Sequence, residues 1–97
     1  MRVRLTRQAA RNIGGIVRYV GERNPAASDA VAAAIRRTIG TIGQFPSAGH
    51  AQKAPNVRKL AVPHYPYLVY FAVDEADQVV LILAVQHAAR RRRHTDA

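Results

Sequence analysis

The chain has 97 residues, and its 15 lysines and arginines outnumber six acidic residues to give a formal net charge of +9. This length allows one domain with a modest core, and the absence of cysteine excludes disulfides and thiolate metal sites. No apolar run reaches the roughly 18 residues that a membrane span needs, and no signal-peptide pattern opens the chain. We therefore expect a cytoplasmic protein that attracts an acidic or polyanionic partner.

The first 22 residues predict a strand followed by a helix. Residues 1–5, MRVRL, alternate arginine with apolar side chains, which is typical of a half-buried strand. Thr6 suits an N-cap, and apolar residues at helical spacing predict an amphipathic helix over residues 7–22. Gly14 and Gly15 weaken this helix, which suggests a place where another helix approaches closely.

A second helix follows almost at once. Asn24 suits an N-cap and Pro25 the first helical position, and the apolar stripe continues until Pro46 and Gly49 end the helix. Because the connection is so short, the two helices should form an antiparallel hairpin.

Three more strands are predicted after the hairpin, at residues 56–62, 65–73 and 78–87, with an acidic turn at residues 74–77 between the last two. The predicted fold class is α+β: an N-terminal strand, a two-helix antiparallel hairpin and a three-stranded antiparallel meander. Pairing the first strand with the meander gives a four-stranded sheet with the hairpin on one face.

The last two predicted strands are apolar on both faces. Strict alternation along residues 78–87 places Leu81, Leu83 and Val85 on one face of the sheet and Val80, Ile82 and Ala84 on the other. Two helices cover only one face of a sheet, so we expect the other face to meet a partner or a second copy of the chain.

Several segments, in this order, resemble the ParE/RelE superfamily of bacterial toxins from type II toxin–antitoxin modules, and its ParE-type branch in particular. They are IVRYVGERNPAAS, FPSAG, VRKL, YPYLVYFAVD and VLILAVQHAAR, and the similarity runs from about Arg4 to Arg90. The resemblance implies a toxin held inactive, in a hetero-oligomer, by a ParD-like antitoxin that wraps the hairpin and the sheet. It further implies DNA gyrase as the target, whereas RelE-type relatives cut messenger RNA on the ribosome.

The resemblance also divides the chain. Residues 1–90 should form a single toxin domain, and residues 91–97 a basic, flexible tail. We expect the arginine run from Arg90 to Arg93 to contact DNA held by gyrase, or an acidic surface of gyrase. A module that has lost its toxicity and only forms a complex with its partner is a third alternative.

RNA cleavage would need a general acid, a general base and cations around the phosphate. No carboxylate falls on a predicted strand, so the base would have to be a histidine, and we favour binding over catalysis. If the chain is a nuclease, its catalytic residues are His87, Arg58, Arg90 and Tyr65. The four histidines show no metal-ligand spacing, so we expect no metal and no cofactor.

Two sets of binding residues follow from the resemblance and the pattern. The residues expected to bind the target are Arg58, Tyr67, His87, Arg90, Arg91 and Arg92. The residues expected to bind the antitoxin are Ile13, Val17, Val31 and Ile35 on the hairpin, and Tyr70 and Ile82 on the sheet.

Overall fold

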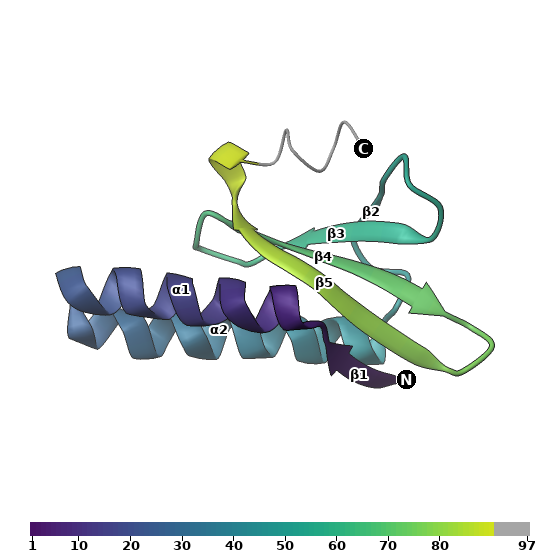
Figure 1. The fold of residues 1–97 in the computed structure, drawn as a ribbon, viewed down its shortest axis with the longest axis horizontal. Coiled ribbons are helices and arrows are strands. Elements are labelled where there is room, and N and C mark those ends of the chain that lie inside the picture. The colour runs from purple at the N-terminus through teal and green to yellow at the C-terminus, as the bar shows by residue number, and fades with distance from the viewer. Residues whose placement is uncertain (91–97) are drawn as a thin grey trace.

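The computed structural model describes residues 1–90, which form a layer of two helices packed on one face of a β-sheet (Figure 1). The elements in chain order are β1 (Arg2–Leu5), α1 (Arg7–Arg23), α2 (Pro25–Gln44), β2 (His50–Ala51), β3 (Val57–Ala61), β4 (Tyr67–Asp74), β5 (Val79–His87) and a 3-10 turn (Ala88–Arg90). This arrangement confirms the predicted α+β fold. The two-residue strand β2 was not predicted, because so short a strand has no alternation to read.

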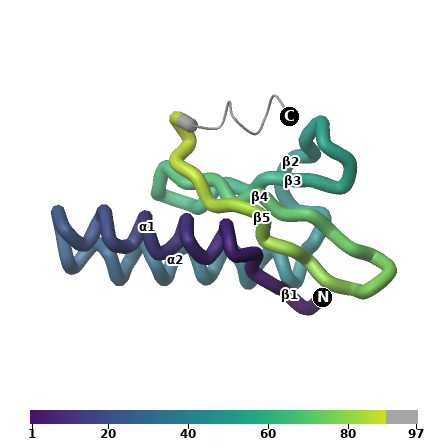
Figure 2. The backbone as a smooth tube through the Cα atoms, viewed as in Figure 1, coloured from purple at the N-terminus to yellow at the C-terminus, as the bar shows by residue number. Residues whose placement is uncertain are grey.

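The sheet has the strand order β1-β5-β4-β3-β2. The chain's first strand pairs in parallel with its last, from Arg2 opposite Val79 to Leu5 opposite Ile82, while the other pairs are antiparallel. Figures 1 and 2 both show the helical hairpin along one face of this sheet, with the N-terminal strand beside the far end of α2. The first and last strands of the described chain are thereby neighbours in the sheet.

The start of α1 is fixed to the sheet by one hydroxyl group. The Thr6 Oγ1 accepts the Ala9 N–H at 3.1 Å, as an N-cap does, and donates toward the carbonyls of Ile82 at 2.9 Å and Leu83 at 3.1 Å. Because of this link, β1 ends and α1 begins directly beside β5.

Asn24 forms the corner of the hairpin. Its backbone N–H donates to the Val20 carbonyl at 2.7 Å, which closes α1, and its Oδ1 accepts the Ala27 N–H at 3.2 Å, which caps α2. Pro25 occupies the first turn of α2, where its missing N–H costs nothing. These predictions from the sequence are confirmed.

The expected close approach at Gly14 and Gly15 is wrong within the described chain. A Cβ atom at either position would meet nothing within 4 Å. The hairpin helices come together instead at Gly21, where a Cβ would lie 3.5 Å from the Ser28 side chain.

A β-bulge interrupts the alternation of β5. The register shifts between Tyr70 and Phe71, which pair with Ala84 and Ile82, so Leu83 is the extra residue on β5. A bulge of this kind reverses the faces of every residue beyond it.

The bulge corrects the predicted faces of this strand. Val80, Ile82 and Val85 all lie in the core against the helices, whereas Leu81 and Ala84 pair with strand residues that face away from them. The strict alternation predicted for residues 78–87 is therefore wrong beyond Ile82.

The core lies between the hairpin and the sheet. Its largest fully buried apolar side chains on the helix side are Phe71, Ile35, Ile42, Ile82, Val62, Val69, Val80 and Val85. Burying a side chain of this size contributes roughly 1.5–3 kcal/mol. No helix in the described part of the chain is long and apolar enough to cross a membrane.

Candidate interaction surfaces

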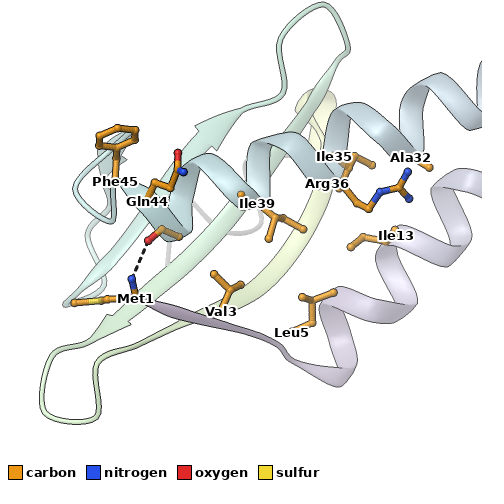
Figure 3. A pocket seen from close by; sticks show the side chains of 12 residues that line it. Met1, Val3, Leu5, Ile13, Ala32, Ile35, Arg36, Ile39, Gln44 and Phe45 are labelled. Carbon is orange, nitrogen blue, oxygen red and sulfur yellow. Dashed lines mark hydrogen bonds between the residues drawn. The ribbon is translucent and has the colours of Figure 1, made fainter.

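An open apolar groove of about 1000 Å³ lies between β1 and α2 (Figure 3). This β1–α2 groove is lined by Met1, Val3, Leu5, Ile13, Ala32, Ile35, Arg36, Ile39, Gly40, Gly43, Gln44 and Phe45. Three of these apolar side chains are unusually exposed: Met1 at 39%, Leu5 at 46% and Phe45 at 61%. Contiguous exposed apolar surface of this kind marks an interaction site.

A glycine allows β1 to lie close to the last turn of α2 beside the β1–α2 groove. The amino nitrogen of Met1 donates to the Gly43 carbonyl at 3.0 Å, drawn as the dashed line in Figure 3. A Cβ on Gly43 would come within 2.9 Å of the Val3 Cγ2, so only glycine lets β1 lie this close to the last turn of α2. Arg36 is the one charged side chain in the lining.

A second groove, of about 580 Å³, lies between α1 and the end of β5. This α1–β5 groove is lined by Arg11, Asn12, Gly15, Ile16, Tyr19, Tyr67, Val85, Gln86, His87 and Ala89. It exists because β1 pairs with β5 only as far as Ile82. Beyond that point the Val85 N–H donates to the Asn12 Oδ1 at 3.1 Å, so a side chain replaces the missing strand.

His87 lies at the open end of the α1–β5 groove, exposed to solvent. Its ring meets the Tyr67 ring edge to face, with centroids 5.7 Å apart and planes at 87°. The Ala89 N–H donates to its Nδ1 at 3.1 Å. A neutral imidazole with an accepting Nδ1 carries its proton on Nε2, so His87 presents a hydrogen-bond donor.

Arg58 is committed to the loop that follows α2. Its Nε donates to the Ala48 carbonyl at 3.0 Å, and its Nη2 donates to the carbonyls of Ser47 at 2.8 Å and Gly49 at 2.9 Å. Gly49 has a φ of +78°, and a Cβ there would collide with the Lys59 carbonyl. The Arg58 guanidinium therefore holds a tight loop in place, a role that the sequence pattern did not predict.

The proposed nuclease residues do not come together. Arg58 pairs with Phe71 and His87 pairs with Tyr67, so they stand four residues apart along β4, or roughly 13 Å. Tyr65 lines a different hollow, against α2. The acidic turn at residues 74–77 lies at the opposite end of β5 from His87. Within residues 1–90, no three His, Asp or Glu side chains could hold a metal ion together.

The register places the expected target residues on the helix side of the sheet. Arg58 pairs with the core residue Phe71, and Tyr67 is itself part of the core and pairs with His87. The basic side chains on the opposite face are those of Lys59, which pairs with Tyr70, and of Arg2 and Arg4, which pair with Val79 and Leu81. Of Arg90 only its place in the 3-10 turn is described, and Arg91 and Arg92 lie outside the described residues.

The residues expected to bind the antitoxin divide into two groups. Ile13 and Ile35 line the β1–α2 groove, and Val17 is half-buried one turn further along α1. The others are almost fully buried in this chain: Val31 at 3%, Tyr70 at 2% and Ile82 at 0% exposed. Ile35, though it borders the groove, is only 1% exposed, so its main contribution is to the core.

Sequence reasoning missed several groove residues. Leu5 and Phe45 were assigned to the apolar stripes of a strand and a helix, although both point to solvent. One signal was available for Phe45: it directly precedes Pro46 and is the C-cap of α2, so it lies beyond the regular stripe. Arg11 and Tyr19 gave no such signal, because exposed polar and aromatic residues on a helix need no special explanation.

The strand, hairpin and meander together form the fold of the ParE and RelE toxins. A chain of the chromosomal ParDE toxin–antitoxin system from P. aeruginosa superposes with a TM-score of 0.80 at 22% identity, covering 90% of this chain and 95% of that one. A chain of the toxin–antitoxin complex RelBE2 from Mycobacterium tuberculosis superposes with a TM-score of 0.60 at 19% identity, covering 89% of this chain and 95% of that one.

Sequence comparison defines the family more closely. A Sinorhizobium fredii protein named as a candidate toxin, Y4kP, is 28% identical over 87 residues, covering 90% of this chain and 88% of its own. The sequence model of the ParE toxin of the type II toxin–antitoxin system parDE matches residues 3–92. The chain therefore belongs to the ParE toxin family of type II toxin–antitoxin systems.

Proposed function

We propose that this toxin arrests growth by binding and inhibiting DNA gyrase, and that a ParD-like antitoxin neutralises it by occupying the β1–α2 groove. Membership of the ParE family supports gyrase as the target. The observation that carries the choice of binding over RNA cleavage is the arrangement of Arg58 and His87, which are separated along the sheet and each engaged in a local hydrogen bond.

Cleavage of RNA requires an acid and a base that reach the same phosphate together. The Arg58 guanidinium donates three hydrogen bonds to the carbonyls of one loop, so it is not directed at a substrate. Within residues 1–90, no carboxylate lies beside His87 to orient or assist it, since the acidic turn lies at the other end of β5. This arrangement favours a protein that acts by contact.

The β1–α2 groove has the properties expected of an antitoxin site. Leu5 and Phe45 offer exposed apolar surface, and Ile13 and Ile39 continue it toward the middle of the hairpin. Arg36 is the only charged side chain among the described lining residues, so it would select an acidic side chain on the segment that docks there. The net charge of +9 favours an acidic antitoxin in the same way.

We propose that the target binds at the exposed end of β5. His87 is solvent-accessible there, and the run of arginines begins three residues later, at Arg90. We propose that Arg90, Arg91 and Arg92 contact gyrase or the DNA that gyrase holds. Tyr67 supports the His87 ring from the core, and Arg58 acts indirectly through the loop at residues 47–49.

Two assays test the proposal. Purified toxin should abolish supercoiling of a relaxed plasmid by gyrase, and a stoichiometric amount of the antitoxin should restore it. Ribosome-dependent cutting of messenger RNA by the same preparation, with gyrase unaffected, would instead establish the RelE-type activity with His87 as its acid–base group.

A further inference from the structure

The α1–β5 groove has no part in the antitoxin contact proposed above, yet its lining is specialised. Of the residues in 1–90 that line it, none is acidic, while Arg11 is exposed and His87 presents its Nε2 donor. Tyr19, at 57% exposure, lies at one end, with the guanidinium carbon of Arg23 3.6 Å from its ring centroid. The groove thus combines positive charge with an exposed aromatic surface.

The glycines of α1 add an independent observation. Gly15 lines the groove, and a Cβ there would meet nothing within 4 Å, so no packing within residues 1–90 explains the absence of a side chain. Glycine inside a helix is unfavourable relative to alanine. A glycine with open space on the floor of a groove is what the close approach of another polypeptide backbone would require.

We propose that the α1–β5 groove binds an acidic polypeptide segment of a partner protein. A carboxylate of the segment accepts hydrogen bonds from the Arg11 guanidinium and from the His87 Nε2–H. Hydrogen bonds to an ionised carboxylate are stronger than those between neutral groups. An apolar side chain next to it packs on Tyr19 and Ile16, and the backbone passes over Gly15. The groove shares His87 and Tyr67 with the surface proposed above for the target, and the inference does not depend on gyrase being that target.

A polypeptide fits the groove better than a nucleic acid does. Besides the cationic Arg11, the lining includes the apolar residues Ile16 and Val85. Sites that follow a nucleic acid backbone are lined more uniformly with lysine and arginine. Charge complementarity selects the acidic class of peptide, because Arg11 is cationic and no described residue of the lining carries a carboxylate.

The test is a titration of the ¹⁵N-labelled full-length chain with a defined peptide, followed through its amide resonances. The probe is an acetylated and amidated pentapeptide of leucine, glutamate, phenylalanine, glutamate and leucine, and its twin carries glutamine in place of glutamate. The acidic peptide should shift the amides of Asn12, Gly15 and His87, and the twin should bind about tenfold more weakly.

Matched variants separate the groove from general attraction to a basic protein. Arg11→Gln should remove the preference for the acidic peptide, whereas Arg7→Gln, an exposed arginine one turn earlier and outside the lining, should keep it. Gly15→Ala should weaken binding severalfold, whereas Gly14→Ala, which lies outside the lining, should leave it unchanged.

Four results would overturn the proposal. The first is equal binding of the two peptides, and the second is resonance shifts confined to the β1–α2 groove or another surface. The third is the absence of any shift at peptide concentrations of about 10 mM. The fourth is that a ten-residue oligothymidylate shifts the same amide resonances at a lower concentration than the peptide does. The last result would assign the groove to nucleic acid. Because each is read on the folded toxin without gyrase, none depends on the outcome of the gyrase assay.

Discussion

The Nδ1 of His87 accepts a hydrogen bond from the backbone N–H of Ala89, two residues further along the chain, at 3.1 Å. This bond stands where β5 turns into the 3-10 turn, and the Ala88 N–H next to it donates to the Pro66 carbonyl at 2.8 Å. The His87 side chain therefore caps the end of a strand. His87, Ala88 and Ala89, which lie in the segment VLILAVQHAAR that resembles the family, therefore have a structural role in this chain.

His87→Gln should leave the toxin folded and toxic. The glutamine amide can still donate a hydrogen bond at the groove, but it cannot transfer a proton at neutral pH. Growth arrest after induction without antitoxin should stay within about tenfold of the parent, as the inducer concentration needed for arrest would show. Complete loss of toxicity in a variant with an unchanged thermal unfolding curve would favour the nuclease alternative.

Arg58→Ala should destabilise the fold rather than abolish the function of the folded protein. Losing the bonds to the carbonyls of Ser47, Ala48 and Gly49 should cost about 2 kcal/mol. For a domain of this size the melting temperature should fall by about 10 °C. Arg58→Lys should recover only part of this loss, since an ammonium cannot reproduce the guanidinium fork.

The control for Arg58 is Arg37→Ala, because Arg37 is exposed on α2. Its melting temperature should stay within about 4 °C of the parent, as for most surface substitutions. A stable Arg58→Ala protein that has lost gyrase inhibition would show that Arg58 contacts the target directly, against the structural role assigned to it.

Charge reversal at Arg36 should separate antitoxin binding from toxicity. Arg36→Glu places a negative charge inside the β1–α2 groove, and the affinity for an acidic antitoxin segment should fall by about 2 kcal/mol, or about 30-fold. Arg37→Glu changes the net charge equally but lies outside this groove. Titration calorimetry should show a large loss of affinity for Arg36→Glu and only a small loss for Arg37→Glu. Comparable losses for the two variants would point to a long-range effect of net charge.

Gly14→Ala should stabilise the toxin. The position has open space for a Cβ, and alanine is favoured over glycine inside a helix by about 1 kcal/mol. The melting temperature should rise by about 4–8 °C. The opposite sign is expected for Gly49→Ala, where a positive φ and the Lys59 carbonyl exclude a side chain. A lower melting temperature for Gly14→Ala would mean that α1 is packed differently from the structure described.

The hairpin was the most predictable part of the fold. Thr6, Asn24 and Pro25 act locally at helix ends, so their identities alone set where the helices begin and end. Strand pairing was less accessible: alternation indicates that residues 1–5 form a strand, but not that β1 pairs in parallel with β5. The bulge at Leu83 was invisible as well, because apolar residues occupy both faces of that strand.

The interaction surfaces were harder to predict than the fold. Ile13, which we expect to bind the antitoxin, lines the β1–α2 groove, whereas the burial of Val31 and Ile82 depends on which side of each element meets the core. We expect Arg58 at a binding surface because exposed cationic side chains commonly bind partners. Its hydrogen bonds to a loop depend on the position of three carbonyl groups that no sequence pattern encodes.

Supercoiling of a relaxed plasmid by purified gyrase, in the presence of increasing amounts of the full-length toxin, tests the central claim most directly. The account predicts loss of supercoiling at micromolar toxin and linear DNA after detergent and protease treatment, both prevented by prior addition of antitoxin. Unchanged supercoiling by toxin that is shown to be folded and free of antitoxin would contradict gyrase inhibition as the function of this chain.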